Sequence, residues 1–234
     1  MTGLQYAADV DGTDLRRWRT VVVPGLAALV IYAALRLIDI GQFRALWRFS
    51  PVEFVLALAT MIAVLALGLL YGVLVAVALS VVAMAAQVAR PASAALGFVP
   101  GLAGMHDVDD FDEVAEVPGL LIFRYDSPVF FANAAHFRDE AQRLIDERLP
   151  GLQWFALNCE AIVEIDSTAV ESLTALIGDV REDGIEFSLV RAKRELVDQL
   201  ARVGLDADIG ADRIFPTLPK LVEAYRAAHP DRPA

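Results

Sequence analysis

Residues Phe54–Val88, FVLALATMIAVLALGLLYGVLVAVALSVVAMAAQV, contain no charged side chain. A helix on the surface of a soluble protein needs one polar face, whereas this run is apolar all the way round. Such a run is typical of a membrane span. As one straight helix it would be about 50 Å long. The hydrocarbon core of a bilayer is about 30 Å thick, and helix tilt absorbs only part of that difference.

Two glycines near the middle of the run, Gly68 and Gly72, flank a short segment that ends in Tyr71, a residue type enriched at the membrane interface. We therefore predict two short spans, about 53–69 and 72–89, joined by a very tight hairpin. Small residues let two helix backbones approach closely, so we expect Gly68 and Gly72 to pack helix against helix. One long bent helix is the alternative.

A third candidate span lies upstream, at about 20–38, after a polar N-terminal tail over 1–19. The segment between the spans, 39–50, interleaves aromatic residues with arginines, which is typical of a connection that lies in the membrane interface. The sequence thus predicts an α-helical membrane segment of about three transmembrane helices over 20–89. Membrane lipid is the first expected partner.

Charge divides the chain into two parts. Residues 1–105 carry 5 acids and 7 arginines, while residues 106–234 carry 26 acids and 13 bases, within a total net charge of −11. The acidic part has no basic patch, which argues against nucleic acid as a partner. A single cysteine, Cys159, excludes an internal disulfide framework. The N-terminus lacks the pattern of a secretory signal peptide.

Arginines predict the orientation of the spans, because cytoplasmic loops carry an excess of positive charge. With three spans, Arg36, Arg44, Arg48 and Arg90 fall on one side, which we place in the cytoplasm. The expected location is therefore the inner membrane, multi-pass, with the acidic domain in the cytoplasm. Residues 16–19, which hold three further arginines, then fall outside. That conflict would disappear if the chain continued a longer polytopic protein.

The remainder of the chain divides into a Gly/Pro-rich and then acidic linker over 90–113, a folded domain over 114–228 and a C-terminal tail over 229–234. Within the domain, strand-like and helix-like patterns alternate, which predicts a soluble α/β fold with a mixed or parallel sheet covered by helices. The expected strands are 120–125, 152–159, 185–190 and 213–215. The acidic run before them lacks the Gly and Glu of a calcium loop, so we interpret it as a solvated linker.

The best candidate site is the loop that follows the second buried strand, where Asp166, Ser167 and Thr168 open a helix. Ligands in open α/β sheets gather at the carboxyl ends of strands. Exposed backbone donors and the helix dipole favour an anion there, including a phosphate added to a hydroxyl. The alternative is that Ser167 or Thr168 is simply the N-cap.

Other chemistry finds little support in the sequence. The three histidines, His106, His136 and His229, are scattered, so neither a metal site nor a catalytic triad can be built around them. No P-loop glycine pattern exists. We therefore expect no enzyme, no catalytic residue, no metal and no cofactor. The apolar run around Gly68 and Gly72 holds no ionisable residue, so no ion pathway is visible there.

Taken together, several short motifs in order resemble the C-terminal end of the SulP family of sulfate permeases, from about residue 20 to 228. The motifs are Leu46-Trp47-Arg48, the span pair with Gly68 and Gly72, Arg90-Pro91, Leu96-Gly97-Phe98-Val99-Pro100-Gly101, Pro118-Gly119-Leu120-Leu121-Ile122-Phe123-Arg124, Phe130-Phe131-Ala132-Asn133 and Asp166-Ser167-Thr168-Ala169.

The resemblance implies that 20–89 correspond to the last three spans of a secondary anion transporter and 114–228 to a STAS domain. In anti-sigma factor antagonists, which share the STAS fold, the residue that matches Thr168 is phosphorylated and Ser167 is its neighbour. The resemblance also implies that the anion-binding spans precede this stretch, so the substrate-binding residues stay unknown. It further suggests a homodimer.

Two hypotheses follow. In the first, the chain is the C-terminal part of a sulfate or other inorganic-anion transporter, truncated or split, which cannot transport alone and works with the remaining spans from another chain. In the second, the spans only tether a STAS regulatory module that binds a partner protein or nucleotide, or is phosphorylated near Thr168.

Overall fold

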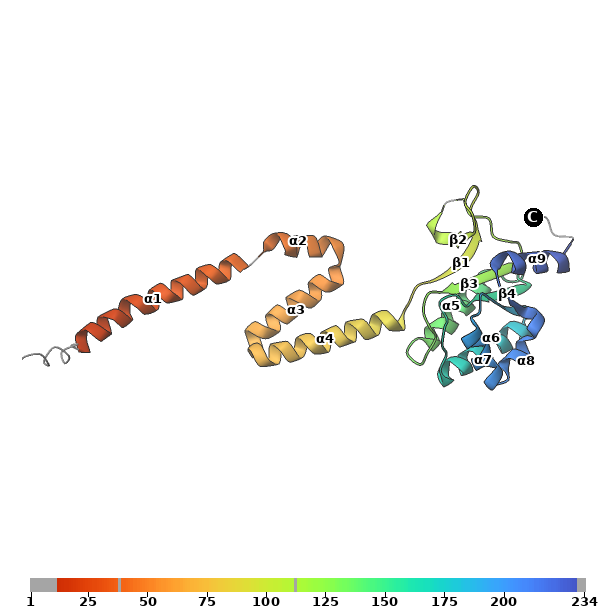
Figure 1. Ribbon diagram of the computed structural model, residues 1–234. Helices are drawn as coiled ribbons and strands as arrows, with labels where there is room; N and C mark the ends of the chain where they lie inside the picture. Colours follow the sequence, from red (N-terminus) through yellow and green to blue (C-terminus); the bar gives the residue numbers. More distant parts are fainter. Residues whose placement is uncertain (1–11, 38, 112, 231–234) are drawn as a thin grey trace, which may run out of the picture. The chain divides into compact units, whose positions relative to one another are not determined.

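The computed structural model describes residues 12–37, 39–111 and 113–230. The chain forms two compact units that divide between Val81 and Val82. The first unit is helical, and the second contains a β-sheet with helices on its two faces (Figure 1).

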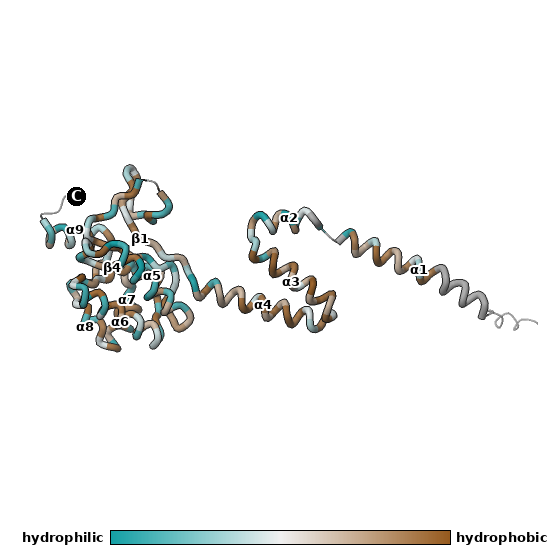
Figure 2. Tube along the Cα trace, turned by 180° about the vertical axis from the view of Figure 1, so that it is seen from behind, coloured by the Kyte–Doolittle hydropathy of each residue, from teal (hydrophilic) through white to brown (hydrophobic). Residues whose placement is uncertain are grey.

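Four helices account for the first unit and the start of the second: α1 (Gly12–Leu37), α2 (Ile40–Phe49), α3 (Pro51–Leu67) and α4 (Leu69–Ala89). Two stretches, Val22–Phe49 and Leu69–Ala89, are long and apolar enough to cross a membrane, judged by length and composition. The shorter helix α3 is also apolar. Hydrophobic residues run along α3 and α4 without a polar face (Figure 2).

Helix α1 differs from the expectation of a polar tail over 1–19, because it already begins at Gly12. Adding residues to an existing helix costs little once the helix is nucleated, and Leu15, Arg16 and Arg17 are good helix formers. The apolar run therefore extends its helix back into the polar segment. The remainder of the expected tail, residues 1–11, lies outside the described residues.

The apolar run forms two helices rather than one bent helix, and a single residue separates them. Gly68 takes a positive φ of 84°, a conformation that side chains with a Cβ rarely adopt. Helix α4 starts at Leu69, three residues before the expected 72, because the Gly72 amide already donates to the Gly68 carbonyl at 2.9 Å. Gly72 is buried, and a Cβ there would lie 2.5 Å from the Cα of Val64. The two backbones therefore touch at Gly72.

The second unit is built on a six-stranded mixed sheet with the order β2-β1-β3-β4-β5-β6. Strands β3 to β6 are parallel, and β1 is antiparallel to both of its neighbours. The strands are β1 (Ser93–Phe98), β2 (Met105–Asp107), β3 (Leu120–Tyr125), β4 (Trp154–Asn158), β5 (Glu186–Val190) and β6 (Ile214–Phe215). The mixed sheet agrees with the fold class predicted from the sequence.

Alternate strand residues enter two separate cores. Phe123, Phe155 and Leu189 point to the face covered by α5 (Ala134–Asp146), α6 (Ser167–Glu182), α7 (Arg194–Arg202) and α8 (Leu205–Ile209). Ile122 and Ala156 point to the opposite face, where α9 (Leu218–Ala228) packs. The central strands are buried on both faces, which explains their nearly continuous apolar sequences.

The segment 90–113, which we expected to be a linker, instead supplies two strands and the short 3-10 helix η1 (Val108–Asp110). Strand β1 has the sequence Ser-Ala-Ala-Leu-Gly-Phe, whose small residues have low strand propensity. Its burial decides the conformation, because Ala94–Gly97 are buried between β2 and β3. Gly97 is required there, since a Cβ would overlap the side chain of Val114.

Candidate functional site

The candidate loop lies at the carboxyl edge of the sheet, meaning the edge at which the parallel strands β3 to β6 end. Three loops meet at this edge: 126–133 after β3, 159–166 after β4 and 191–193 after β5. Val129 and Ile165 form a parallel bridge between the first two loops. The strand order from β3 to β6 never reverses, so this edge has no crevice of the kind that opens at a topological switch point.

Asp166 holds two loops together. One of its carboxylate oxygens, Oδ1, accepts the amide of Ala169 at 2.8 Å and thereby caps α6. The other, Oδ2, accepts the amide of Phe131 at 2.8 Å from the neighbouring loop. The N-cap is therefore Asp166, which corrects the alternative that Ser167 or Thr168 occupies that position. A carboxylate suits the role because it can accept both bonds and is favoured by the helix dipole.

Ser167 and Thr168 are the first two residues of α6, and both are exposed. Neither hydroxyl makes a hydrogen bond within the described part of the chain. The exposed Glu164 lies shortly before them in the loop. Both hydroxyls are thus accessible from solvent at a helix N-terminus, where a phosphate is electrostatically favoured by the helix and disfavoured by nearby carboxylates.

Asn133 fixes the loop between β3 and α5. This residue is only 1% exposed, its Oδ1 accepts the Phe130 amide at 2.9 Å, and its Nδ2 donates to the Pro128 carbonyl at 2.9 Å. Its side chain turns back into the loop and makes no cap bond to α5. Phe131 is held by Asp166 on one side and packs edge-on against Phe130, yet it is 73% exposed. The loop therefore presents an aromatic side chain to solvent from a fixed backbone.

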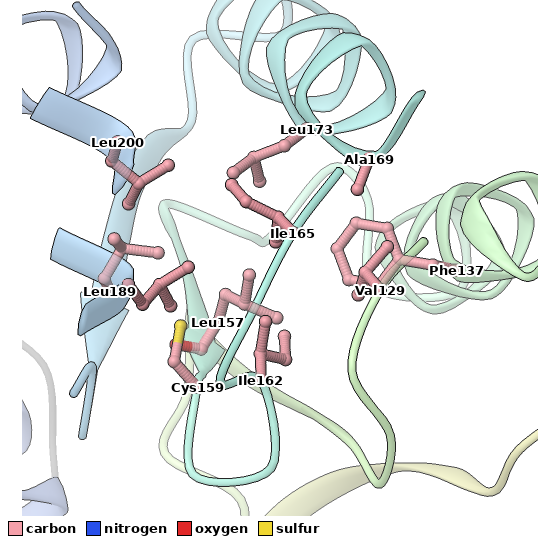
Figure 3. Close-up of a pocket in the computed structure, with 11 residues that line it drawn as sticks. Val129, Phe137, Leu157, Cys159, Ile162, Ile165, Ala169, Leu173, Leu189 and Leu200 are labelled. Atoms are coloured by element: carbon pink, nitrogen blue, oxygen red, sulfur yellow. The ribbon is translucent and has the colours of Figure 1, made fainter. Parts of the chain in front are cut away.

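Behind these loops lies a small apolar cavity (Figure 3). Its volume of about 10 Å³ leaves space for one water at most. The Cys159 thiol faces this cavity, and burial raises its pKa far above the ordinary value, so the thiol stays neutral. The other lining residues are apolar: Val129, Phe137, Leu157, Ile162, Ile165, Ala169, Leu173, Leu189, Leu196 and Leu200. The cavity offers neither a base nor room for a substrate.

Residues 113–221 match the model of the STAS domain. A probable sulfate transporter of Mycobacterium tuberculosis strain H37Rv is 49% identical over 204 residues, which cover 87% of this chain and 36% of that protein. Sulfate transporter 1.3 of Arabidopsis thaliana is 29% identical over 208 residues, covering 85% of this chain and 32% of the plant protein.

The chain carries a STAS domain and is similar to the C-terminal portion of SulP-family sulfate transporters. It spans about a third of the length of the curated relatives that it matches. These relatives are named as transporters and not as enzymes. The fold is also similar to that of the murine Solute Carrier 26 family member A9 anion transporter in the inward-facing state, with a TM-score of 0.66, 22% identity, and coverage of 82% of this chain and 31% of the murine one.

The histidines of this chain lie apart from one another. His106 stacks edge-on with Phe111, His136 lies 3.3 Å from the Tyr125 hydroxyl, and His229 packs against Tyr225. Among the described residues, no group of three His, Cys, Asp or Glu side chains could hold a metal ion. The candidate site of the STAS domain therefore consists of the loops that Asp166 joins.

Sequence reasoning missed the basic loop after β5. Arg191 takes a positive φ of 58° and pairs with Glu160 at 2.6 Å, while the exposed Lys193 and Arg194 open α7. The sequence does contain a signal for this loop, because three bases lie within four residues directly after a buried strand. The strongly acidic average of residues 106–234 concealed it.

Proposed function

We propose that this chain forms the closing membrane helices and the cytoplasmic STAS regulatory domain of a SulP-type sulfate or inorganic-anion transporter. The observation that carries the proposal is 49% identity to a probable sulfate transporter across both the helical and the STAS parts, over 87% of the chain. That match covers 36% of the relative. The spans that bind the anion would then come from the remainder of a longer polypeptide or from another chain.

The apolar helices α3 and α4 offer no charged side chain for an anion between Phe54 and Val88, which supports this division of labour. No side chain between Phe54 and Val88 carries a charge that could neutralise a sulfate. Apart from Gly72, no residue of α3 or α4 is buried within this chain. Their apolar surfaces, among them Leu65 and Leu69, are therefore available for lipid and for the remaining spans.

Transport assays test the proposal. We expect vesicles that contain this chain alone to accumulate no radiolabelled sulfate. Coexpression with the preceding two thirds of the mycobacterial relative should restore uptake driven by a proton or sodium gradient. Uptake by this chain alone would contradict the proposal, and so would a failure of the two parts to copurify from the membrane.

The orientation rests on positive charge. Arg36, Arg44, Arg48 and Arg90 are exposed, and none of the four forms an ion pair within the described residues. With α1, α3 and α4 as the three spans, Arg36, Arg44 and Arg48 follow the first span and Arg90 follows the third, so all four would lie on the cytoplasmic side of the inner membrane, together with the STAS domain. Cysteines introduced near Arg44 and in the STAS domain should react with an impermeant maleimide only in inside-out vesicles.

A second function, a membrane-anchored regulatory module, is favoured by the loop geometry. Asp166 takes over the capping and leaves the Thr168 hydroxyl exposed and without a hydrogen bond in the described part of the chain. In this reading the STAS domain is phosphorylated at Thr168 or binds a partner protein or nucleotide, and a homodimer would bring two such loops together.

Intact mass after incubation with cell extract tests this second function. A mass increase of one phosphate that is lost in Thr168→Ala and kept in Thr174→Ala would support it. Thr174 is a suitable control, because it is exposed on the same helix and its hydroxyl is occupied by the Val170 carbonyl at 2.7 Å. If neither phosphate content nor partner binding changes in Thr168→Ala, the residue is only part of the helix start.

A further inference from the structure

The carboxyl edge of the STAS domain is its electropositive pole. Four helices begin there, at Ala134, Ser167, Arg194 and Leu218. Each helix N-terminus carries a partial positive charge equivalent to roughly half an elementary charge. The corresponding C-termini of these helices lie toward the opposite edge, so the four dipoles point in a common direction along the strands.

Charged side chains follow the same division. In the segments at the carboxyl edge, including the first residue of each helix, bases and acids balance: Arg90, Arg191, Lys193 and Arg194 against Asp126, Glu160, Glu164 and Asp166. In the described segments at the opposite edge, acids dominate: Glu113, Glu116, Glu147, Asp183, Asp206, Asp208 and Asp212 against Arg148 and Arg213. The strongly acidic domain therefore presents one edge without a net negative charge.

Several of the charges at that edge are already paired or hydrogen-bonded. Glu160 is neutralised by Arg191, Asp126 lies 3.0 Å from Arg124, and the Asp166 carboxylate is occupied by two backbone amides. Within the described residues, Lys193 and Arg194 have no acidic partner. The unpaired side chains in the described part of this edge are thus Arg90, Lys193 and Arg194 against Glu164 and the exposed Glu195, and the four helix N-termini add partial positive charge.

The carboxyl edge is also the edge at which the chain arrives from α4. Ser93 pairs with Tyr125, the last residue of β3, and the Asp126 amide donates to the Ala92 carbonyl at 3.0 Å. Only three residues separate Ala89 from Ser93, so these two Cα atoms lie within about 14 Å of each other. If α4 spans the bilayer, as the proposed function requires, this edge lies beside the lipid headgroups.

Phe131 completes the surface. An aromatic side chain that is 73% exposed on a backbone fixed by Asp166 is suited to enter an interface without loss of loop entropy. Aromatic residues are favoured at headgroup depth, where their apolar rings leave water.

We infer that the carboxyl edge of the STAS domain docks on the anionic surface of the bilayer, with Phe131 among the headgroups and Lys193 and Arg194 at lipid phosphates. The occupant is an anionic lipid surface because the edge carries unpaired bases and four helix N-termini, has an exposed aromatic side chain at its tip and is tethered within headgroup reach. The acidic opposite edge is repelled from the same surface. Each basic residue near such a surface contributes about a fivefold preference for the docked state.

The test uses the full chain in nanodiscs, with an environment-sensitive fluorophore on Phe131→Cys. The native Cys159 is fully buried and should not react. The matched control is Leu102→Cys, since Leu102 is 49% exposed in the loop between β1 and β2, at the opposite edge. We expect lipids with a nitroxide in the headgroup to quench the label at position 131 and to leave the label at position 102 unquenched.

Quenching at position 131 should increase with the fraction of phosphatidylglycerol and decrease in Lys193→Gln/Arg194→Gln and in 1 M salt, where the Debye length is about 3 Å. Equal quenching at the two positions would overturn the inference. A blue-shifted but unquenched label at position 131 would also overturn it, because protein would then cover the site. Ala132→Cys serves as a second exposed label site if Phe131→Cys fails to fold.

The proposed function and the docking inference fail in different ways in this experiment. A chain that does not coelute with nanodiscs lacks membrane spans, which contradicts the proposed function and removes the basis for docking. A chain that coelutes with nanodiscs and leaves position 131 unquenched retains its spans and refutes docking alone.

Discussion

Replacing Asp166 by alanine removes the carboxylate that joins the two loops of the candidate site. The change deletes the N-cap bond to the Ala169 amide and the inter-loop bond to the Phe131 amide, each 2.8 Å long. Loss of an N-cap costs typically about 1 kcal/mol. A bond from a charged acceptor is worth about 1.5–3 kcal/mol when buried, but the Phe131 amide lies at an exposed position where water can replace the acceptor. We therefore assign about 1 kcal/mol to the second bond and expect a loss of about 2 kcal/mol in total.

Urea unfolding of the chain in nanodiscs measures this loss. Trp154 is 2% exposed and packs against Tyr225, so its fluorescence reports on the STAS domain. The two tryptophans of the helical part, Trp18 and Trp47, are replaced by phenylalanine to isolate that signal. A loss of 2 kcal/mol corresponds to about a thirtyfold larger unfolding constant.

Two comparisons separate the roles of the carboxylate. Asp166→Asn retains one oxygen for the cap but places an amide donor against the Phe131 amide, so we expect about half of the loss. Ser167→Ala should stay within about 0.5 kcal/mol of the parent, because its side chain is exposed. Hydrogen exchange at the Ala169 and Phe131 amides should accelerate in Asp166→Ala. A loss below about 0.5 kcal/mol with unchanged exchange at both amides would refute the role of Asp166 in joining the two loops.

Three further changes test other parts of the structure. Gly72→Ala should open the α3–α4 hairpin, because a Cβ would overlap Val64; the distance between spin labels on α3 and on the first half of α4 should increase. Gly178→Ala should stabilise the domain by about 0.5–1 kcal/mol in urea, since this exposed glycine lies within α6 and nothing surrounds its Cα. Glu140→Gln should lower stability by less than about 1 kcal/mol at pH 7 and by progressively less as the pH falls below 4.5, because the Arg143 guanidinium holds the pKa of Glu140 below that ordinary value.

The sign of the Glu140 effect follows from that lowered pKa. A carboxylate whose pKa is lower in the folded state contributes stability above its unfolded pKa and loses it as the pH falls through the folded pKa. A Glu140→Gln penalty that did not decrease as the pH falls would contradict the role of Arg143. For the hairpin, Gly25→Ala is the control, because nothing lies near Gly25, and it should leave the label distance unchanged. A destabilised Gly178→Ala would indicate an unseen contact at that position.

The central strands could be predicted from the sequence because burial and propensity agree there. Leu120–Tyr125 and Trp154–Asn158 are rich in aromatic and aliphatic residues, and these ranges fall within the expected strands. The break near Gly68 was equally readable, since a glycine permits the positive φ that separates two apolar helices. In these places the local pattern and the tertiary environment favour the same conformation.

Elsewhere contacts between residues distant in sequence, rather than the local pattern, determine the conformation. Strand β1 is made of small residues whose place in the sheet depends on pairing with Leu120–Tyr125, more than twenty residues later. The role of Asp166 depends on the Phe131 amide, 35 residues away, which no local motif reveals. The exposure of Phe131 and the grouping of Lys193 with four helix N-termini likewise require the sheet to bring distant loops to one edge.

The candidate loop and the carboxyl edge of the sheet meet at Thr168. This residue lies at the positive pole of the STAS domain, at the start of α6. A phosphate there adds nearly two negative charges and would cancel the free charges of Lys193 and Arg194. Phosphorylation would thus release the edge from an anionic bilayer without any change of fold. In the nanodisc assay, Thr168→Glu should reduce quenching at position 131 about fivefold. Thr168→Gln, which has the same shape as the glutamate variant but no charge, should not reduce it. Equal quenching in the two variants would show that a charge at position 168 does not affect membrane docking. Partner binding would then be the role that we propose for the phosphate.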